Sequence, residues 1–390
     1  MNFDLTDEQR MICDTADRLG ADFGPDYWLE KDRAKAFPQE LWQAICEAGL
    51  CGVALPEAYG GSGLGMQEMA LIVEHLAACG GGATLGQLFM INPIFGGVSL
   101  SRFGSERQKA EMLPALTAGR LNFCMALTEP DAGSNTLELR SFARADGEGW
   151  RLTGQKIWIT GVKEGHKMLV VARTKKVEEV TRRTEGLTMF MIDIDRPGLS
   201  YAPIEKLGTN TLSSCSVFFD DVRIEPHELV GTLHGGWFEL LEVLNTERIV
   251  TTAALIGAGD MAIRQAVEYA KVRKVFRGTP IGAYQGVQFP LAQAHAQLQT
   301  ARLMNLKAAW LCDQGRPYGS EANTAKLIAA QAAMSAIEHA MQTLGGMGYA
   351  RESHLERLWR DARLFKFAPV AEEMVLNFIA THDLGLPRGY

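Results

Sequence analysis

Leu127-Thr-Glu-Pro-Asp-Ala-Gly-Ser134 is followed, 24 residues after its last residue, by Trp158-Ile-Thr160. The first segment combines turn-forming residues with hydroxyl groups and backbone N–H groups. A short alternating pattern, typical of β-strands, connects it to the second segment. Two segments of this kind can hold a flat, hydrogen-bonding ring from two sides.

Each of these residues also has an ordinary structural interpretation. Thr128, Ser134 and Thr160 are typical of caps at turns and strand ends. Trp158 alternates with the isoleucines on either side of it, so it faces the other side of a strand from them. A tryptophan in such a place is most often part of the core. The combination, and no single residue, therefore indicates a functional site.

The pattern on both sides of this stretch predicts three regions. Residues 5 to about 118 are mainly helical, with an N-cap pattern at Asp4-Leu-Thr-Asp-Glu. Short alternating runs follow, and long helical patterns return from Gly235. We expect an α+β multidomain fold. It comprises an N-terminal helical domain (1–120), a middle antiparallel β-barrel or sandwich domain (121–232) and a C-terminal four-helix-bundle domain (233–390).

Composition excludes several classes of protein. The 390 residues are 47% hydrophobic and 22% charged with a net charge of −7, and no basic cluster predicts nucleic-acid binding. We find no secretory signal at the N-terminus. We expect no membrane span, because we count no uncharged apolar run of the roughly 18 residues that a spanning helix needs. The seven cysteines are scattered, which favours free thiols in a reducing cytoplasm. No ligand spacing predicts a metal site.

Two glycine patterns invite comparison with nucleotide-binding loops. Gly257-Ala-Gly-Asp-Met-Ala262 fits G-x-G-x-x-A, but it lies inside a long helical pattern and not at a strand-to-helix turn. We interpret its small residues as helix-packing contacts. The loop from Gly60 to Gly65 is interpreted as a surface connection. Neither pattern predicts a cofactor site.

Glu247 and Arg248 are the only charged residues between Val243 and Gly259. A helix so apolar is expected to be buried, and a buried carboxylate has a raised pKa unless it is paired. Adjacent helical residues point about 100° apart, so these two need not pair with each other. Two interpretations stay open: a core ion pair through another partner, or a desolvated general base.

Three pairs of segments resemble the acyl-CoA dehydrogenase family of flavoenzymes, in order and over essentially the whole chain. They are Met125–Asn135 with Lys156–Thr160, Tyr269–Phe276 with Pro280–Gln285, and Gln342–Tyr349 with Arg357–Arg363. The resemblance implies a tetramer that holds FAD between the β domain and the helical bundle. Within one subunit the implied flavin contacts are Leu127, Thr128, Ser134, Trp158, Ile159 and Thr160. Those reaching the FAD of a neighbouring subunit are Arg273, Phe276, Gln285, Gln342, Gly345 and Gly346.

The resemblance also implies a reaction, α,β-desaturation of an acyl-CoA thioester, with electrons passing to an electron-transferring flavoprotein. Many family members carry the base at the position of Pro369, which cannot be one. A minority, similar to isovaleryl- and long-chain acyl-CoA dehydrogenases, place a glutamate just before an arginine on the first long C-terminal helix. Glu247 matches that pattern. Asn245 and Arg248, with Ser134, then become the candidates for binding the CoA substrate.

Pro369 leaves the chemistry open in one respect. In the family a backbone N–H at this position helps to polarise the thioester carbonyl, and proline has no N–H. Either another donor substitutes, the local alignment shifts, or the chemistry has changed. Two rivals therefore stand beside the dehydrogenase. One is an oxygen-using monooxygenase or oxidase on the same fold, and the other is a catalytically degenerate CoA-binding scaffold.

Overall fold

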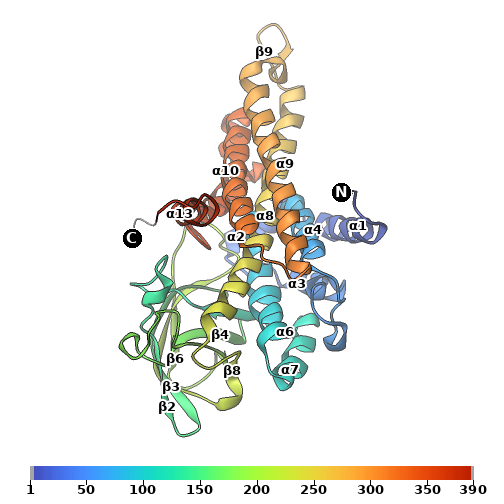
Figure 1. Ribbon diagram of the computed structural model, residues 1–390. Helices are drawn as coiled ribbons and strands as arrows, with labels where there is room; N and C mark the ends of the chain where they lie inside the picture. Colours follow the sequence, from blue (N-terminus) through green and yellow to red (C-terminus); the bar gives the residue numbers. More distant parts are fainter. Residues whose placement is uncertain (1–3, 388–390) are drawn as a thin grey trace.

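The computed structural model describes residues 4–387, and helices, strands and helices follow one another in the predicted order (Figure 1). The α+β multidomain prediction is confirmed. The N-terminal helices are α1 (Asp7–Asp22), α2 (Pro25–Ala34), α3 (Gln39–Glu47), α4 (Met66–Leu76), α5 (Gly82–Phe89), α6 (Ser99–Phe103) and α7 (Glu106–Thr117). The predicted first N-cap is also confirmed. Thr6 Oγ1 accepts a hydrogen bond from Gln9 N, and Thr6 N donates to Gln9 Oε1, both at 3.1 Å.

One apolar helical stretch corrects the sequence analysis. Met66–Phe103 is long and apolar enough to cross a membrane by length and composition alone, with a mean hydropathy of 1.3. However, 78% of its apolar window is buried inside the protein. The stretch consists of α4, α5 and α6 joined by the π-helical segments η3 (Ala77–Gly81) and η4 (Met90–Val98). Its apolar character is that of core helices packed against α8.

The middle region forms one eight-stranded sheet in the order β6-β7-β3-β2-β4-β5-β8, with β1 also paired to β4. The strands are β1 (Phe123–Ala126), β2 (Phe142–Asp146), β3 (Gly149–Thr160), β4 (Lys167–Arg173), β5 (Leu187–Asp193), β6 (Leu199–Pro203), β7 (Ser214–Ile224) and β8 (Leu229–Val230). Most neighbours are antiparallel, as predicted. However, β4 pairs in parallel with both β1 and β2. A mainly antiparallel β domain was therefore predicted correctly. The two parallel pairings of β4 were not predicted.

Three long helices dominate the C-terminal region: α8 (Gly236–Val272), α9 (Gln285–Asp313) and α10 (Gly319–Leu344). The fourth helix of the predicted bundle is replaced by the short helices α11 (Gly346–Tyr349), α12 (Leu355–Arg363) and α13 (Glu372–Phe378). A hairpin of β9 (Lys274–Val275) and β10 (Thr279–Pro280) connects α8 to α9. The packing interpretation of Gly257 is confirmed, since a Cβ there would lie 2.3 Å from the Glu74 carbonyl oxygen.

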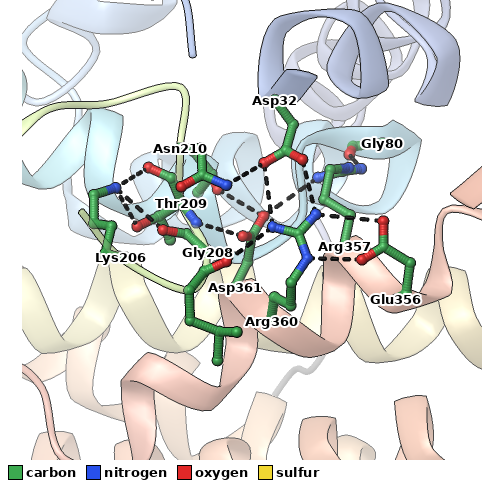
Figure 2. A network of polar contacts seen from close by, with 12 residues as sticks. Asp32, Gly80, Lys206, Gly208, Thr209, Asn210, Glu356, Arg357, Arg360 and Asp361 are labelled. Atoms are coloured by element: carbon green, nitrogen blue, oxygen red, sulfur yellow. Dashed lines mark hydrogen bonds and ion pairs between the residues drawn. The ribbon is translucent and has the colours of Figure 1, made fainter. Parts of the chain in front are cut away.

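A polar network holds the three regions together (Figure 2). Arg360 on α12 forms an ion pair with Asp32 on α2, and Asn210 from the loop after β6 donates to the same carboxylate. Beside them, Asp361 accepts hydrogen bonds from Thr209 N and from Thr84 Oγ1. Because each region contributes a partner, the network fixes the position of the β domain against the helices.

Candidate active site

The two segments that open the sequence analysis lie side by side. Ile157 N donates a hydrogen bond to the carbonyl oxygen of Thr128 at 2.9 Å, just beyond the end of β1. Lys156 Nζ donates to the carbonyl oxygen of Leu127, also at 2.9 Å. The chain leaving β1 is therefore fastened to the end of β3, and Trp158 and Thr160 follow immediately. This brings together the residues that were predicted to hold a flat ring.

A buried ion pair between Lys156 and Glu129 supports this arrangement, and the sequence analysis missed it. Lys156 is fully buried, and its ammonium donates to Glu129 Oε1 at 2.9 Å and to the Val171 carbonyl oxygen at 2.7 Å. The Glu129 carboxylate also accepts from the backbone N–H groups of Arg140 and Ser141. Burial lowers the pKa of Lys156 to about 8, against the attraction of Glu129. The available signal was a lysine directly before the apolar run Ile157-Trp-Ile159.

Trp158 is not a core residue, although that was the ordinary expectation. Its side chain is 55% exposed, and its φ of 62° is left-handed. The register between β3 and β7 shifts between Lys156 and Ile159, so the strand bulges here and turns the indole outward. Left-handed backbone in a bulky residue is strained, and such strain is concentrated at functional sites. Ile159, by contrast, is buried in the core of the β domain, which leaves only its backbone for contact with a ligand.

Three hydroxyl side chains of the two segments are free to hydrogen-bond with a ligand. Within residues 4–387, the side-chain hydroxyls of Thr128, Ser134 and Thr160 make no hydrogen bond to another residue. Thr128 and Thr160 are half-buried, whereas Ser134 is exposed in the turn after β1. The exposed indole and the two threonine hydroxyls thus form a surface with one aromatic face and free hydrogen-bonding groups. That surface matches what a flat heteroaromatic ring requires.

Glu247 lies on α8, where that helix is buried against α5, η4 and α10. Its side chain has no ion pair or hydrogen bond within the described part of the chain, so the core-ion-pair interpretation is not supported. Burial raises the pKa of Glu247 to about 8, although the positive charges of Arg248 and Lys326 oppose that rise. A carboxyl group with a pKa near neutrality can accept a proton from a weak carbon acid.

Arg248 does not pair with its neighbour Glu247, as the sequence analysis anticipated. Its Nη1 donates to Oδ1 of Asn245, one turn earlier on α8. The residue is only 9% exposed, and its Nε has no hydrogen-bond partner among the described residues. A buried, incompletely satisfied guanidinium is costly and is available to a ligand acceptor. Arg248 and Asn245 therefore form a second polar group within one turn of Glu247.

The other predicted cofactor residues lie at the far end of the molecule. Phe276 (83% exposed) and Gln342 line a pocket of about 400 Å³ between the β9–β10 hairpin, the start of α9 and the end of α10. Arg273 and Gln285 are exposed in the same connection between α8 and α9. Added Cβ atoms at Gly345 and Gly346 would meet nothing within 4 Å, so that segment is open to a ligand or partner.

The length of α8 separates this pocket from Trp158. At 37 residues the helix is about 55 Å long. The residues at its N-terminal end contact the β domain through β5, and the hairpin follows its C-terminal end. Figure 1 shows the hairpin, labelled β9, at the opposite end of the molecule from the strands. The two groups of predicted residues therefore cannot contact one cofactor within a single chain.

Comparisons with known proteins agree with this geometry. Models of the N-terminal, middle and C-terminal domains of acyl-CoA dehydrogenase match residues 6–120, 124–222 and 234–383. The chain is 41% identical over 372 residues to acyl-CoA dehydrogenase FadE12 of Mycobacterium tuberculosis, which covers 95% of this chain and 94% of that protein. The protein is a flavoenzyme-type oxidoreductase. It belongs to the acyl-CoA dehydrogenase family.

Solved structures show the same architecture. Glutaryl-coenzyme A dehydrogenase in complex with glutaryl-CoA superimposes with a TM-score of 0.94 at 27% identity, covering 100% of this chain and 98% of that one. The prolyl acyl carrier protein oxidase AnaB and the FAD complex of PigA each have a TM-score of 0.93, at 27% and 26% identity. They cover 98% and 99% of this chain, respectively, and all of their own chains. The expected cofactor, FAD, is thus confirmed for the family.

The residues present fit FAD. The exposed, left-handed Trp158 and the free hydroxyls of Thr128 and Thr160 provide an aromatic surface with hydrogen-bonding groups. The open glycines Gly345 and Gly346 leave room for close approach at the other end of the molecule. Sequence reasoning identified these residues through motifs. It could not identify Lys156 and Glu129, which shape the site without facing it.

Proposed function

We propose that the protein catalyses α,β-desaturation of an acyl-CoA thioester, with Glu247 as the base that removes the α-proton. The observation that carries this proposal is the state of Glu247, which is buried, unpaired within residues 4–387, and has a pKa raised to about 8. A carboxylate in ordinary solvent is too weak a base for a thioester α C–H, and desolvation strengthens it.

The α C–H bond breaks and its proton moves to the Glu247 carboxylate, while the β C–H bond breaks and its hydrogen leaves with the electron pair. A C=C bond forms between the two carbons. FAD, when bound, supplies the acceptor for that hydride. Arg248 and Asn245, one turn or less from Glu247, are proposed to hold the polar part of the CoA thioester near the base.

We propose that the flavin site is shared between subunits of a homotetramer. Leu127, Thr128, Trp158 and Thr160 of one subunit would hold the ring, with Ser134 near the phosphates or the CoA entrance. The residues proposed to reach it from a neighbouring subunit are Arg273, Phe276, Gln285, Gln342, Gly345 and Gly346. The length of α8 supports this division, because the two groups lie too far apart to serve one cofactor in one chain.

The physiological setting is proposed on the family relationship. Acyl-CoA dehydrogenases act in fatty acid β-oxidation, and we propose that role here in the cytoplasm, with an electron-transferring flavoprotein as the electron acceptor. The choice of acceptor is testable, since a dehydrogenase reduces it in a coupled dye assay and an oxidase does not. The acyl chain length is identified by which acyl-CoA reduces the flavin.

The test is an anaerobic titration of the purified FAD-bound protein with a panel of acyl-CoAs, for wild type and Glu247→Gln. We expect bleaching of the flavin absorbance in wild type and a reduction rate lower by about 10²–10⁴-fold in the variant. Glu268→Gln is the matched control, because Glu268 is exposed on the same helix. Equal bleaching in wild type and Glu247→Gln would remove Glu247 from the mechanism.

A second candidate function is an oxygen-using oxidase or monooxygenase on the same fold. Pro369 favours it, because proline lacks the backbone N–H expected to polarise a thioester carbonyl. The similarity to the prolyl acyl carrier protein oxidase AnaB points the same way. Rapid reoxidation of the reduced flavin in air, with hydrogen peroxide as product, would favour this candidate. Slow reoxidation in air together with acyl-CoA bleaching would favour the dehydrogenase.

A further inference from the structure

Lys326 is a buried cation that neither the predicted site nor the reaction above uses. It lies on α10, is 0% exposed, and its Nζ donates one hydrogen bond, to the carbonyl oxygen of Val370 at 2.6 Å. No carboxylate within residues 4–387 forms an ion pair with it. The nearby Glu372 carboxylate is instead bound by Lys366 at 3.0 Å. A buried ammonium without a direct ion-pair partner is costly, which makes it a candidate for a functional role.

The packing of α10 against α8 brings Lys326 close to Glu247. A Cβ at Gly319, at the start of α10, would lie 3.7 Å from Asn245 Nδ2 on α8. At the other end, residues just beyond α8 share a pocket with the end of α10, so the two helices run parallel. Lys326 is therefore level with Thr252, less than two helical turns beyond Glu247. A lysine side chain is long enough to cover most of that separation.

The charged groups that act on Lys326 come from α8, from the segment before Pro369 and from α13. They are Glu247 and Arg248 on α8, Lys366 before the Pro369 segment, and Glu372 and Glu373 at the start of α13. Arg248 is hydrogen-bonded to Asn245, and Lys366 and Glu372 are paired with each other. Neither Arg248 nor Lys326 has its charge neutralised by an ion pair within residues 4–387, and both charges, that of Arg248 first, act to lower the pKa of the base.

We propose that Lys326 is a positioning residue for Glu247. Its ammonium is a second counter-charge, beside the Arg248 guanidinium, that favours ionisation of the buried base, and its hydrogen bond to Val370 ties the segment after Pro369 to α10. This inference rests on the proposed role of Glu247. The base, Arg248 and Lys326 then form one charge cluster, in which removing a proton from Glu247 is favoured by a group contributed from a different helix.

The variants separate charge from hydrogen bonding. Lys326→Gln removes the charge and keeps an N–H donor for Val370, Lys326→Arg keeps both, and Lys326→Met removes both. Lys307→Gln is the control, because Lys307 lies on the neighbouring helix α9, is 55% exposed and pairs with Glu321 of α10. The first measurement is the pH dependence of flavin reduction by the responding acyl-CoA. We expect Lys326→Gln to move its midpoint upward by about one pH unit, with the high-pH plateau retained.

A substrate-independent measurement keeps the inference testable by itself. Infrared difference spectra between each protein and its Glu247→Gln counterpart isolate the carbonyl band of the protonated Glu247 carboxyl group, which is then followed against pH. Its midpoint is expected to rise by about one unit in Lys326→Gln and to stay unchanged in Lys326→Arg and Lys307→Gln. If no acyl-CoA reduces the flavin, the proposed function fails while this titration still decides the coupling.

Two results of these measurements decide the role of Lys326. A raised Glu247 midpoint in Lys326→Gln, with rates lowered about tenfold at pH 7 and restored at high pH, supports the inference. Rates lowered equally at every pH, with the infrared midpoint unmoved, would show that Lys326 only supports the fold and would overturn it. If Lys326→Met does not fold, Lys326→Gln still gives the answer, because it keeps a polar N–H donor at this position.

Discussion

Nη2 of Arg360 lies 2.8 Å from Oδ2 of Asp32, and this ion pair joins α12 near the C-terminus to α2 near the N-terminus. Asn210 of the β domain donates to the other oxygen of the same carboxylate at 3.0 Å (Figure 2). Asp32 is 8% exposed, so little water is available to replace either partner. One buried carboxylate therefore contacts all three regions of the chain.

Arg360→Ala should lower the free energy of unfolding by about 3 kcal/mol, because it leaves the Asp32 carboxylate buried with only its amide partner. Arg107→Ala is the control, since Arg107 and Glu111 form an exposed pair for which about 0.5 kcal/mol is expected. Chemical denaturation of both variants measures the difference. A loss below 1 kcal/mol for Arg360→Ala would contradict the role assigned to this network.

Trp158→Ala should weaken FAD retention without lowering the stability of the flavin-free protein. The indole is 55% exposed on left-handed backbone, so its removal loses little packing. Trp150→Ala, on the same strand, removes a ring that packs 5.2 Å from Phe190, and it should cost about 2 kcal/mol or more. Thermal melts without flavin, together with flavin content after gel filtration, separate the two effects. Equal destabilisation by both variants would show that Trp158 contributes to core packing.

Flavin reduction by acyl-CoA should become faster as the pH rises. Because the pKa of Glu247 is raised to about 8, only the minority of molecules with an ionised base react at neutral pH. The second-order rate constant is expected to increase about tenfold per pH unit up to pH 8 and to level off above it. Stopped-flow absorbance between pH 6 and 9.5, about that midpoint, measures it. A rate independent of pH over this range would rule out a base with this pKa.

Glu247→Gln should stabilise the protein at alkaline pH. The folded pKa of about 8 lies above the ordinary value of 4.5, so the contribution of this carboxyl group is fully present below pH 4.5. It is lost at about 1.4 kcal/mol per pH unit until pH 8, and glutamine does not titrate. The variant's melting temperature relative to wild type should therefore increase from pH 5 to pH 9. Exposed Glu268→Gln should show no such trend, and a flat difference for Glu247→Gln would contradict its buried, unpaired state.

Sequence patterns predicted the order of the regions because local signals decide it. The capping box at Thr6 and the small residues at Gly257 act within one helix or one contact, and both are found as expected. The parallel pairing of β4 with β1 and β2 was not predictable, since it depends on how distant segments meet. The length of the apolar stretch Met66–Phe103 was underestimated, and its burial against other helices, which sequence does not show, identifies it as core.

At the candidate site, motifs predicted the residues that are proposed to face a ligand and missed those that hold them in place. Glu247 was recognised from its apolar helix, yet sequence could not decide whether it was paired. The bulge that turns Trp158 outward depends on its register with β7. The contact of Lys326 with Val370 joins residues 44 positions apart, and Lys156 meets Glu129 across 27. Such partners become visible only when the helices and strands are placed together.

The 37-residue span of α8 has a genetic consequence under the proposed sharing of FAD. Each polypeptide would donate its β-domain half to one flavin and its hairpin half to another. Two defective alleles, one altered at Trp158 and one at Phe276, would then each encode an inactive enzyme when expressed alone. Expressed together, they would assemble mixed oligomers in which some flavins lie between two intact halves. Co-expression would restore part of the activity that neither allele encodes by itself.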